Sequence, residues 1–219
     1  QYYQAEQKGW VLYLEGSTDL TVLQAAADLL QHEARSFLEQ PFVRYVGNQP
    51  QKAREHFFGL QEAKMDLVGI AIFDHLDRPL QSHPALLETM WRRREIENYL
   101  CSEEVLVAYA RHDLPDDLFG LAEAGRREAA MREAITEISE ALRRLKKPEP
   151  WSPEIKVTDE FLAPLFERYF EKLGLPNLLR KSGYHELARW VPREKIDPEM
   201  AEKLDAIVRI AARAKPVTG

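Results

Sequence analysis

Acidic residues that could hold a divalent cation follow three apolar segments of the chain. Glu15 comes directly after a short apolar run, and Asp19 stands four positions further on. Asp74 and Asp77 come at the end of a longer apolar run, and Glu97 lies near the end of a third segment. Because the carboxyl ends of parallel strands lie along one edge of a sheet, we expect these carboxylates to converge there.

Carboxylates that converge repel one another, and a divalent cation removes this conflict. Mg²⁺ prefers oxygen ligands and keeps several of its water molecules, so a few carboxylates are enough to hold it. Two such ions about 3.5–4 Å apart can bind the attacking and the leaving oxygen of a phosphodiester. The five acids together therefore predict a metal site suited to phosphodiester cleavage.

Each acid taken alone has a simpler explanation as a helix cap or an ion-pair partner, since the chain has 36 acidic residues. Asp19 suits the first turn of a helix, where the helix dipole favours negative charge. Glu15 differs, because a carboxylate at the end of a buried strand is costly unless something pairs with it. The set, rather than any single member, favours metal binding.

The first hundred residues alternate between strand and helix patterns. The predicted strands are apolar runs bounded by turn residues, at residues 10–14, 42–46 and 66–74. Helical spacing of apolar residues predicts two helices between them, at residues 18–37 and 52–65. Ser17 or Thr18 is expected to cap the first helix. This alternation predicts a parallel α/β sheet with crossover helices.

The stretch that follows is less regular. Residues 78–89 contain Pro79 and Pro84 and predict a loop. The pattern of residues 90–100 is ambiguous, and Trp91, Ile96 and Tyr99 favour a strand that runs into a turn. Glu97 is therefore expected near a strand end.

The composition changes after residue 100. Helices are predicted in the second half at residues 102–109, 114–147, 159–172, 185–191 and 198–212. Three prolines between 148 and 153 predict a stiff linker. We expect two domains, an α/β domain over residues 1–101 and a helical domain over residues 102–219.

Bulk properties exclude several classes of protein. The 219 residues include 30 basic and 36 acidic side chains, a net charge of −6, which is not that of a basic nucleic-acid-binding domain. A single cysteine, Cys101, excludes an internal disulfide and fits a reducing compartment, so we expect a cytoplasmic location. No apolar run is long enough to span a bilayer, and no membrane association is expected. The chain begins without Met, which suggests a fragment of a longer protein.

Leu14-Glu15-Gly16-x-x-Asp19, an aspartate pair after a later strand, and Glu-Ile-Glu97-Asn-Tyr-Leu together resemble a Toprim domain. More narrowly, the chain resembles the C-terminal region of class 2 nucleases of the overcoming-lysogenization-defect (OLD) family. The resemblance extends to Lys181-Ser-Gly-Tyr-His in the helical half. It implies Mg²⁺-dependent DNA cleavage by a two-metal mechanism, with Mn²⁺ as a substitute. It also implies an ATPase domain before residue 1, through which the longer protein would bind ATP and form oligomers.

The resemblance implies a role for each matching residue. Glu15, Asp19, Asp74, Asp77 and Glu97 would bind metal, with Glu15 also catalytic. The ammonium group of Lys181 would stabilise the charge of the transition state. One departure concerns the aspartate pair, whose usual spacing is Asp-x-Asp, whereas Leu76 stands at the second position here. Asp77 or His75 is left to complete the motif.

We therefore expect a metal-dependent DNA endonuclease. A topoisomerase-like or primase-like Toprim enzyme is the alternative within the same fold. A third hypothesis is an interaction module whose acids bind only a structural ion. The basic run Arg92-Arg93-Arg94 is either a set of phosphate contacts or a solvated surface.

Overall fold

The structure, a computed structural model, describes residues 1–217. It is a mixed α/β protein with a parallel sheet, as the sequence predicts. The sheet has four strands and is accompanied by many helices. The chain forms two compact units: unit 1 contains residues 1–92 and the chain from residue 196 on, and unit 2 contains residues 93–195. The compact units thus differ from the predicted ranges 1–101 and 102–219, because the last helix belongs with the sheet.

The sheet of unit 1 has the order β2-β1-β3-β4. Its strands are β1 (Trp10–Leu14), β2 (Val43–Tyr45), β3 (Val68–Phe73) and β4 (Leu86–Met90). All three pairings are parallel, with Tyr13 opposite Ala71 and Phe73 opposite Met90. Every residue of β1 and β3 is buried, which fits their near-continuous apolar sequence and their central place.

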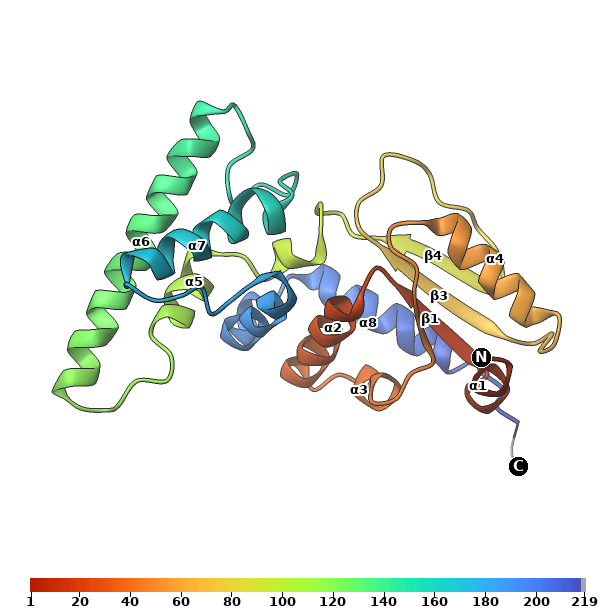
Figure 1. Cartoon of the computed structure of the whole chain (residues 1–219). Helices are drawn as coiled ribbons and strands as arrows, with labels where there is room; N and C mark the ends of the chain where they lie inside the picture. The colour runs from red at the N-terminus through yellow and green to blue at the C-terminus, as the bar shows by residue number, and fades with distance from the viewer. Residues whose placement is uncertain (218–219) are drawn as a thin grey trace. The chain divides into compact units, whose positions relative to one another are not determined.

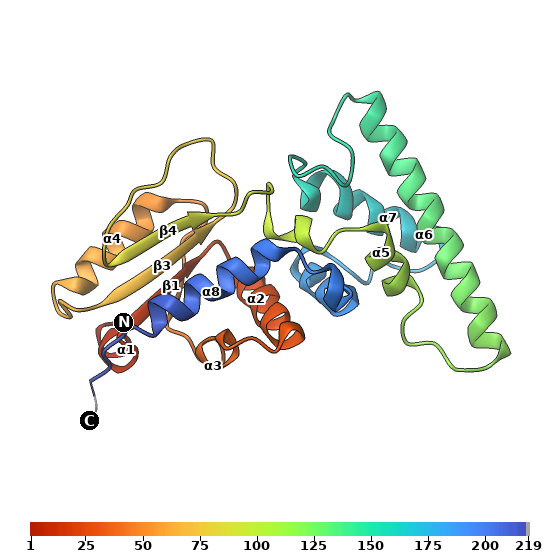
Figure 2. The same cartoon turned by 180° about the vertical axis from the view of Figure 1, so that it is seen from behind.

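Helices lie on both faces of this sheet (Figures 1 and 2). One face is covered by α4 (Pro50–Gln61), and the other by α2 (Ser17–Leu30) and α8 (Pro198–Ala211). The short helices α1 (Tyr2–Lys8) and α3 (Ala34–Leu38) complete unit 1. Ala53, Phe57 and Leu60 recur at helical spacing and bury one side of α4 against the sheet. Gly69 allows this close packing, since a Cβ there would lie 2.9 Å from the Phe57 ring.

Unit 2 is helical. Its α-helices are α5 (Glu103–Ala110), α6 (Leu118–Arg144) and α7 (Ala163–Lys172), with the π-helical turn η2 (Thr158–Leu162) leading into α7. Short 3-10 segments are η1 (Ile96–Tyr99), η3 (Lys181–Trp190) and η4 (Arg193–Lys195). Aromatic rings fill its core. The rings of Phe166 and Tyr109 pack edge to face, with 5.3 Å between their centroids.

Three local predictions need correction. Leu86–Met90 is a strand, although residues 78–89 predict a loop. Pro84 lies before the first residue of this strand and does not interrupt it. The buried carboxylate of Glu88 is neutralised by the Arg54 guanidinium, with 2.9 Å between Nη1 and Oε1. No strand follows it at residues 90–100, so Glu97 lies in η1 rather than at a strand end. The expected helix 18–37 is broken by Gln31, whose φ of 52° ends α2.

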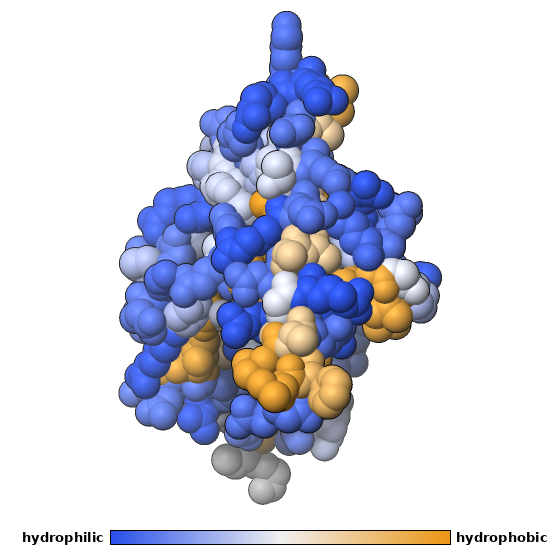
Figure 3. Space-filling view, turned by 90° about the vertical axis from the view of Figure 1, so that its left-hand side faces the viewer, coloured by the Kyte–Doolittle hydropathy of each residue, from blue (hydrophilic) through white to orange (hydrophobic). Residues whose placement is uncertain are grey.

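Figure 3 shows one face of the molecule, which is mainly hydrophilic and carries separate apolar patches. In unit 2 the first turn of α6 exposes Leu118 and Phe119 by 83% and 85%. None of the helices in the described residues is long and apolar enough to cross a membrane.

Candidate metal site

The carboxyl end of β1 turns directly into α2, and this turn fixes Asp19. The helix begins at Ser17 with Gly16 as its N-cap, so neither Ser17 nor Thr18 caps it as predicted. Instead the Gly16 N–H donates a hydrogen bond of 2.7 Å to Asp19 Oδ2, across the first turn. Asp19 is only 5% exposed. Its carboxylate therefore has a defined position at the edge of the sheet.

Glu15 lies at the same strand end but points into solvent. The residue is exposed, and within residues 1–217 its carboxylate has no hydrogen bond or ion pair. Glu15 therefore needs no partner to neutralise its charge, contrary to the prediction, because an exposed carboxylate is solvated by water. The backbone is fixed nevertheless, since the Gly47 N–H donates to the Glu15 carbonyl at 3.2 Å.

Asp74 follows β3, the strand beside β1, and a neighbouring loop fixes its position. The Asn48 amide donates to Asp74 Oδ2 at 2.9 Å, and the Asp74 N–H donates to Asn48 Oδ1 at 2.9 Å. This pair of bonds ties the loop after β2 to the end of β3. Asn48 thereby determines the orientation of the Asp74 carboxylate. The sequence predicts a turn at Gly47-Asn48-Gln49-Pro50 with Asn48 as a candidate helix cap, but Gln49 is the N-cap of α4, so the role of Asn48 was missed.

His75 and Asp77 complete this loop. His75 Nδ1 lies 3.2 Å from the Trp91 carbonyl oxygen. A carbonyl oxygen can only accept, so Nδ1 carries the proton and the lone pair is on Nε2. Metal-binding histidines commonly donate their other ring N–H in this way. Asp77 is exposed in the loop that follows, so His75 is the better-positioned residue of the two.

Tyr45 ends β2 on the other side of β1. Burial raises the pKa of the Tyr45 hydroxyl, and the negative charge of Asp19 raises it further. Asp19 therefore acts electrostatically on Tyr45, and the ends of β2, β1 and β3 carry polar groups along one edge of the sheet.

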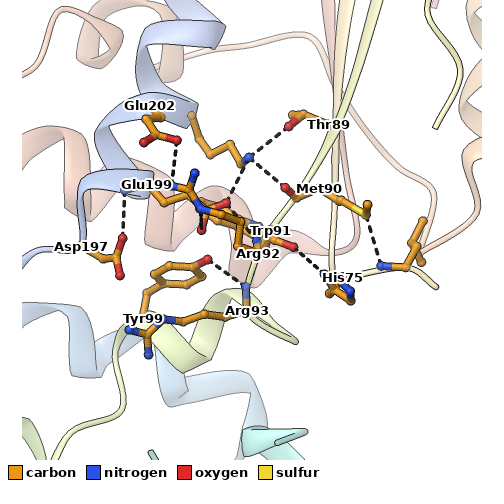
Figure 4. A network of polar contacts seen from close by, with 12 residues as sticks. His75, Thr89, Met90, Trp91, Arg92, Arg93, Tyr99, Asp197, Glu199 and Glu202 are labelled. Carbon is orange, nitrogen blue, oxygen red and sulfur yellow. Dashed lines mark hydrogen bonds and ion pairs between the residues drawn. The ribbon is translucent and has the colours of Figure 1, made fainter. Parts of the chain in front are cut away.

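A buried charge network fixes the end of β4 (Figure 4). Glu199 on α8 is 1% exposed and accepts a hydrogen bond of 2.9 Å from the Arg92 N–H. Lys203, one turn later, lies 3.2 Å from Glu199 Oε1 and donates to the Met90 carbonyl at 2.8 Å. The i,i+4 spacing of these two residues was the signal in the sequence that could have found them.

The same network changes the interpretation of the basic run. The Arg92 guanidinium pairs with Glu199 at 3.3 Å and with Glu202 at 2.9 Å. These ion pairs hold α8 at the end of β4. Arg92 thus has a structural function, whereas the sequence left it between a phosphate contact and a solvated residue.

Glu97 and Lys181 belong to unit 2. Glu97 is half-buried in η1, whose neighbouring residue Asn98 accepts from the Glu95 N–H at 2.8 Å and donates to the Ile155 carbonyl at 3.1 Å. Lys181 is exposed and pairs with Asp159. The roles that the resemblance implies for these two residues stay predictions.

The chain matches no protein-family model, no curated protein and no solved structure in the three comparisons made with known proteins. The resemblance to OLD-family nucleases therefore rests on the residues and motifs alone.

No three His, Cys, Asp or Glu side chains within residues 1–217 are grouped so that they could hold a metal ion together. Mg²⁺ does not require such a group, because it is usually held by one or two carboxylates, its own waters and substrate phosphates. Asp19 and Asp74 supply hard oxygen ligands at adjacent strand ends, and His75 supplies an imidazole nitrogen in the residue after Asp74. The chemistry of these donors fits a weakly held divalent cation completed by substrate.

Proposed function

We propose that this chain carries a Mg²⁺-dependent nuclease domain that cleaves the phosphodiester bonds of DNA. The observation that carries the proposal is the buried carboxylate of Asp19, held by the Gly16 N–H at the carboxyl edge of a parallel sheet. Ligands of open α/β sheets bind at this edge. A carboxylate that a backbone N–H holds in one orientation at this edge is pre-organised to act as a ligand, which supports a function for Asp19 in metal binding.

Asp74 provides the second support. It follows the strand next to β1, and the hydrogen bond from the Asn48 amide to Oδ2 limits the rotation of its side chain, while the Asp74 N–H holds Asn48 in place. Two carboxylates with fixed positions at adjacent strand ends are pre-organised for a cation, so little ordering is needed when one binds. A bound Mg²⁺ would supply Lewis acidity and an activated water for phosphodiester hydrolysis.

The residues of the chain would divide the work. Asp19 and Asp74 hold the cation, Glu15 follows the same strand as Asp19, and His75 and Asp77 lie in the loop after Asp74. Asn48 orients Asp74. The resemblance to OLD-family nucleases implies two further roles, a metal ligand for Glu97 and the positive charge for the transition state for Lys181.

The test is nicking of supercoiled plasmid by the purified chain, with Mg²⁺, with Mn²⁺ and with EDTA. We expect metal-dependent nicking that Asp19→Asn abolishes. Asp28→Asn is the matched control, because Asp28 lies on the same helix and its side chain is 74% exposed. Nicking by Asp19→Asn at the wild-type rate, or nicking in EDTA, would overturn the proposal. Metal binding without nicking would identify an interaction module instead, and a covalent protein–DNA adduct would identify a topoisomerase.

A further inference from the structure

The outer edge of the sheet bears a cavity that the proposed metal site does not use. The cavity has a volume of about 510 Å³ and lies in unit 1 between the end of β2 and the first half of α4. The residues that line it include charged and polar side chains and one turn glycine: Arg44, Tyr45, Gly47, Lys52, Glu55 and His56. β2 is an edge strand, so this side of the sheet has no further strand beside it.

Two basic side chains in this cavity have no acidic partner. Arg44 and Lys52 are both exposed, and within residues 1–217 neither forms an ion pair or a side-chain hydrogen bond. Arg54, only two residues after Lys52, is by contrast fully engaged by Glu88 at 2.9 Å. The unpaired state of Arg44 and Lys52 is therefore a local feature of the cavity.

The other ionisable groups in the cavity leave it positive. Glu55 is the acid that lines it, and its carboxylate accepts a hydrogen bond of 2.9 Å from the Gln51 amide. His56 Nδ1 shares a hydrogen bond of 2.8 Å with the Tyr13 hydroxyl. Burial lowers the pKa of His56, and the charge of Arg44 lowers it further, which favours the neutral imidazole. Arg44 and Lys52 outnumber the one carboxylate.

The cavity borders the proposed metal site. The Val46 N–H donates to the Leu14 carbonyl at 3.0 Å, and the Gly47 N–H donates to the Glu15 carbonyl. These bonds place the end of β2 directly beside the end of β1. Tyr45, which lines the cavity, lies within the electrostatic influence of Asp19. A polymer bound at Asp19 and extending past β2 would reach Arg44 and Lys52.

We propose that Arg44 and Lys52 bind backbone phosphates of double-stranded DNA beside the phosphodiester held at Asp19 and Asp74. The inference rests on the proposed function, since the DNA must pass the carboxyl edge of the sheet. Lysine and arginine contacts to phosphates supply most of the sequence-independent affinity of proteins for DNA. A chain with a net charge of −6 needs such a local positive surface to bind a polyanion.

The test is a fluorescence-anisotropy titration of a labelled DNA duplex, performed in EDTA so that no cleavage occurs. The variants are Arg44→Ala/Lys52→Ala and the control Lys8→Ala/Arg209→Ala, which removes the same charge from exposed, unpaired sites of unit 1. We expect the first to bind on the order of tenfold more weakly. Its plot of log affinity against log salt should become shallower by about two, because two phosphate contacts are lost. The control should match the wild type.

Arg44→Lys/Lys52→Arg keeps both charges and should restore binding. Equal affinity and salt dependence in the alanine pair, the control and the wild type would overturn the inference, as would a wild-type chain that does not bind the duplex. Because binding is measured without metal, the two proposals fail separately. If the chain binds DNA through Arg44 and Lys52 but never nicks plasmid, the proposed nuclease activity is refuted and the DNA-binding surface is supported.

Discussion

Acidic side chains are used differently in the two units. In unit 1, Asp19 and Glu199 are 5% and 1% exposed, and each accepts a hydrogen bond from a backbone N–H. In unit 2, Glu123 and Glu137 lie on the surface of α6 and pair with arginine or lysine side chains. Exposed pairs of this kind contribute about 0–1 kcal/mol each. A carboxylate held by the backbone keeps one orientation, and an exposed one does not.

Burial alone does not define function, as Glu95 shows. It is the buried acid at the start of unit 2, and its carboxylate accepts from the Thr158 N–H at 2.9 Å. Burial raises the pKa of Glu95. Glu95 joins two chain segments, whereas Asp19 and Asp74 stand at the open edge of a sheet. Position in the fold, together with burial, distinguishes a candidate ligand from a structural acid.

The largest effect expected on stability comes from Glu199→Ala. The change leaves Lys203, whose side chain is 10% exposed, and the Arg92 N–H without their carboxylate. Breaking a buried ion pair in this way costs about 3–5 kcal/mol in the free energy of unfolding, measured by urea titration. Glu202→Ala removes only an exposed partner of Arg92 and should cost less than about 1 kcal/mol. An equal loss of unfolding free energy in the two variants would show that the buried network stabilises the protein no more than an exposed ion pair does.

The network at β4 also shows where the sequence was informative. The apolar runs predicted β1 and β3, because a buried central strand has little choice of composition. The alternation of strand and helix patterns predicted the edge strand β2 and the parallel sheet. These patterns did not predict β4, whose Glu88 needs Arg54 from α4 as a partner. The place of α8 in unit 1 depends on Glu199 and Lys203 meeting Met90 and Arg92, more than a hundred residues away. The i,i+4 spacing marks Glu199 and Lys203 as a pair, but nothing in the local sequence shows that they meet residues 90 and 92.

The candidate site was predicted in the same uneven way. Strand ends followed by acids identified Glu15, Asp19 and Asp74, since topology alone places the ends of parallel strands together. Their relative importance was not predictable, because it depends on burial: Asp19 is enclosed and Glu15 is exposed. Asn48 was predicted as a turn residue, since only the fold shows that its amide meets Asp74.

Lys181→Ala should produce the largest loss of cleavage attributable to unit 2. The resemblance assigns the Lys181 ammonium to the transition state, and such an interaction is worth about 10²–10³-fold in rate. A plasmid-nicking time course at saturating Mg²⁺ measures it. Arg180→Ala, an exposed neighbour, is the control and should change the rate little. Normal turnover in Lys181→Ala would confine the chemistry to unit 1 and leave Lys181 as the surface partner of Asp159.

Asn48→Ala tests whether orientation matters in unit 1. The change removes the hydrogen bond of 2.9 Å from the Asn48 amide to the Asp74 carboxylate, and groups that orient metal ligands typically contribute about 10–100-fold to metal affinity or activity. We expect the Mn²⁺ affinity to fall while the circular dichroism spectrum is kept. Gln51→Ala, which removes only surface contacts to Glu55 and Arg54, should leave it unchanged. Unaltered Mn²⁺ affinity in Asn48→Ala would remove Asp74 from the site.

The smallest effect concerns the surface pairs of unit 2. Hydrogen bonds from Arg168 and Lys172 lower the pKa of Glu137 from 4.5 to about 2. A lowered folded-state pKa gives stability that is present above the ordinary value and is lost as the pH falls towards the folded value. Thermal melts between pH 4.5 and 2 should therefore depend less on pH in Glu137→Gln. Glu167→Gln, an exposed acid of α7, should keep the wild-type profile.

The central claim is that the fixed carboxylates of Asp19 and Asp74 bind a divalent cation. Its most direct test is a Mn²⁺ titration followed by electron paramagnetic resonance, on the wild type, Asp19→Asn, Asp74→Asn and Asp28→Asn. We predict that the wild type and Asp28→Asn bind Mn²⁺ equally and that Mg²⁺ displaces it, whereas Asp19→Asn and Asp74→Asn lose binding. Equal binding by all four proteins, or no binding by the wild type, would contradict the claim.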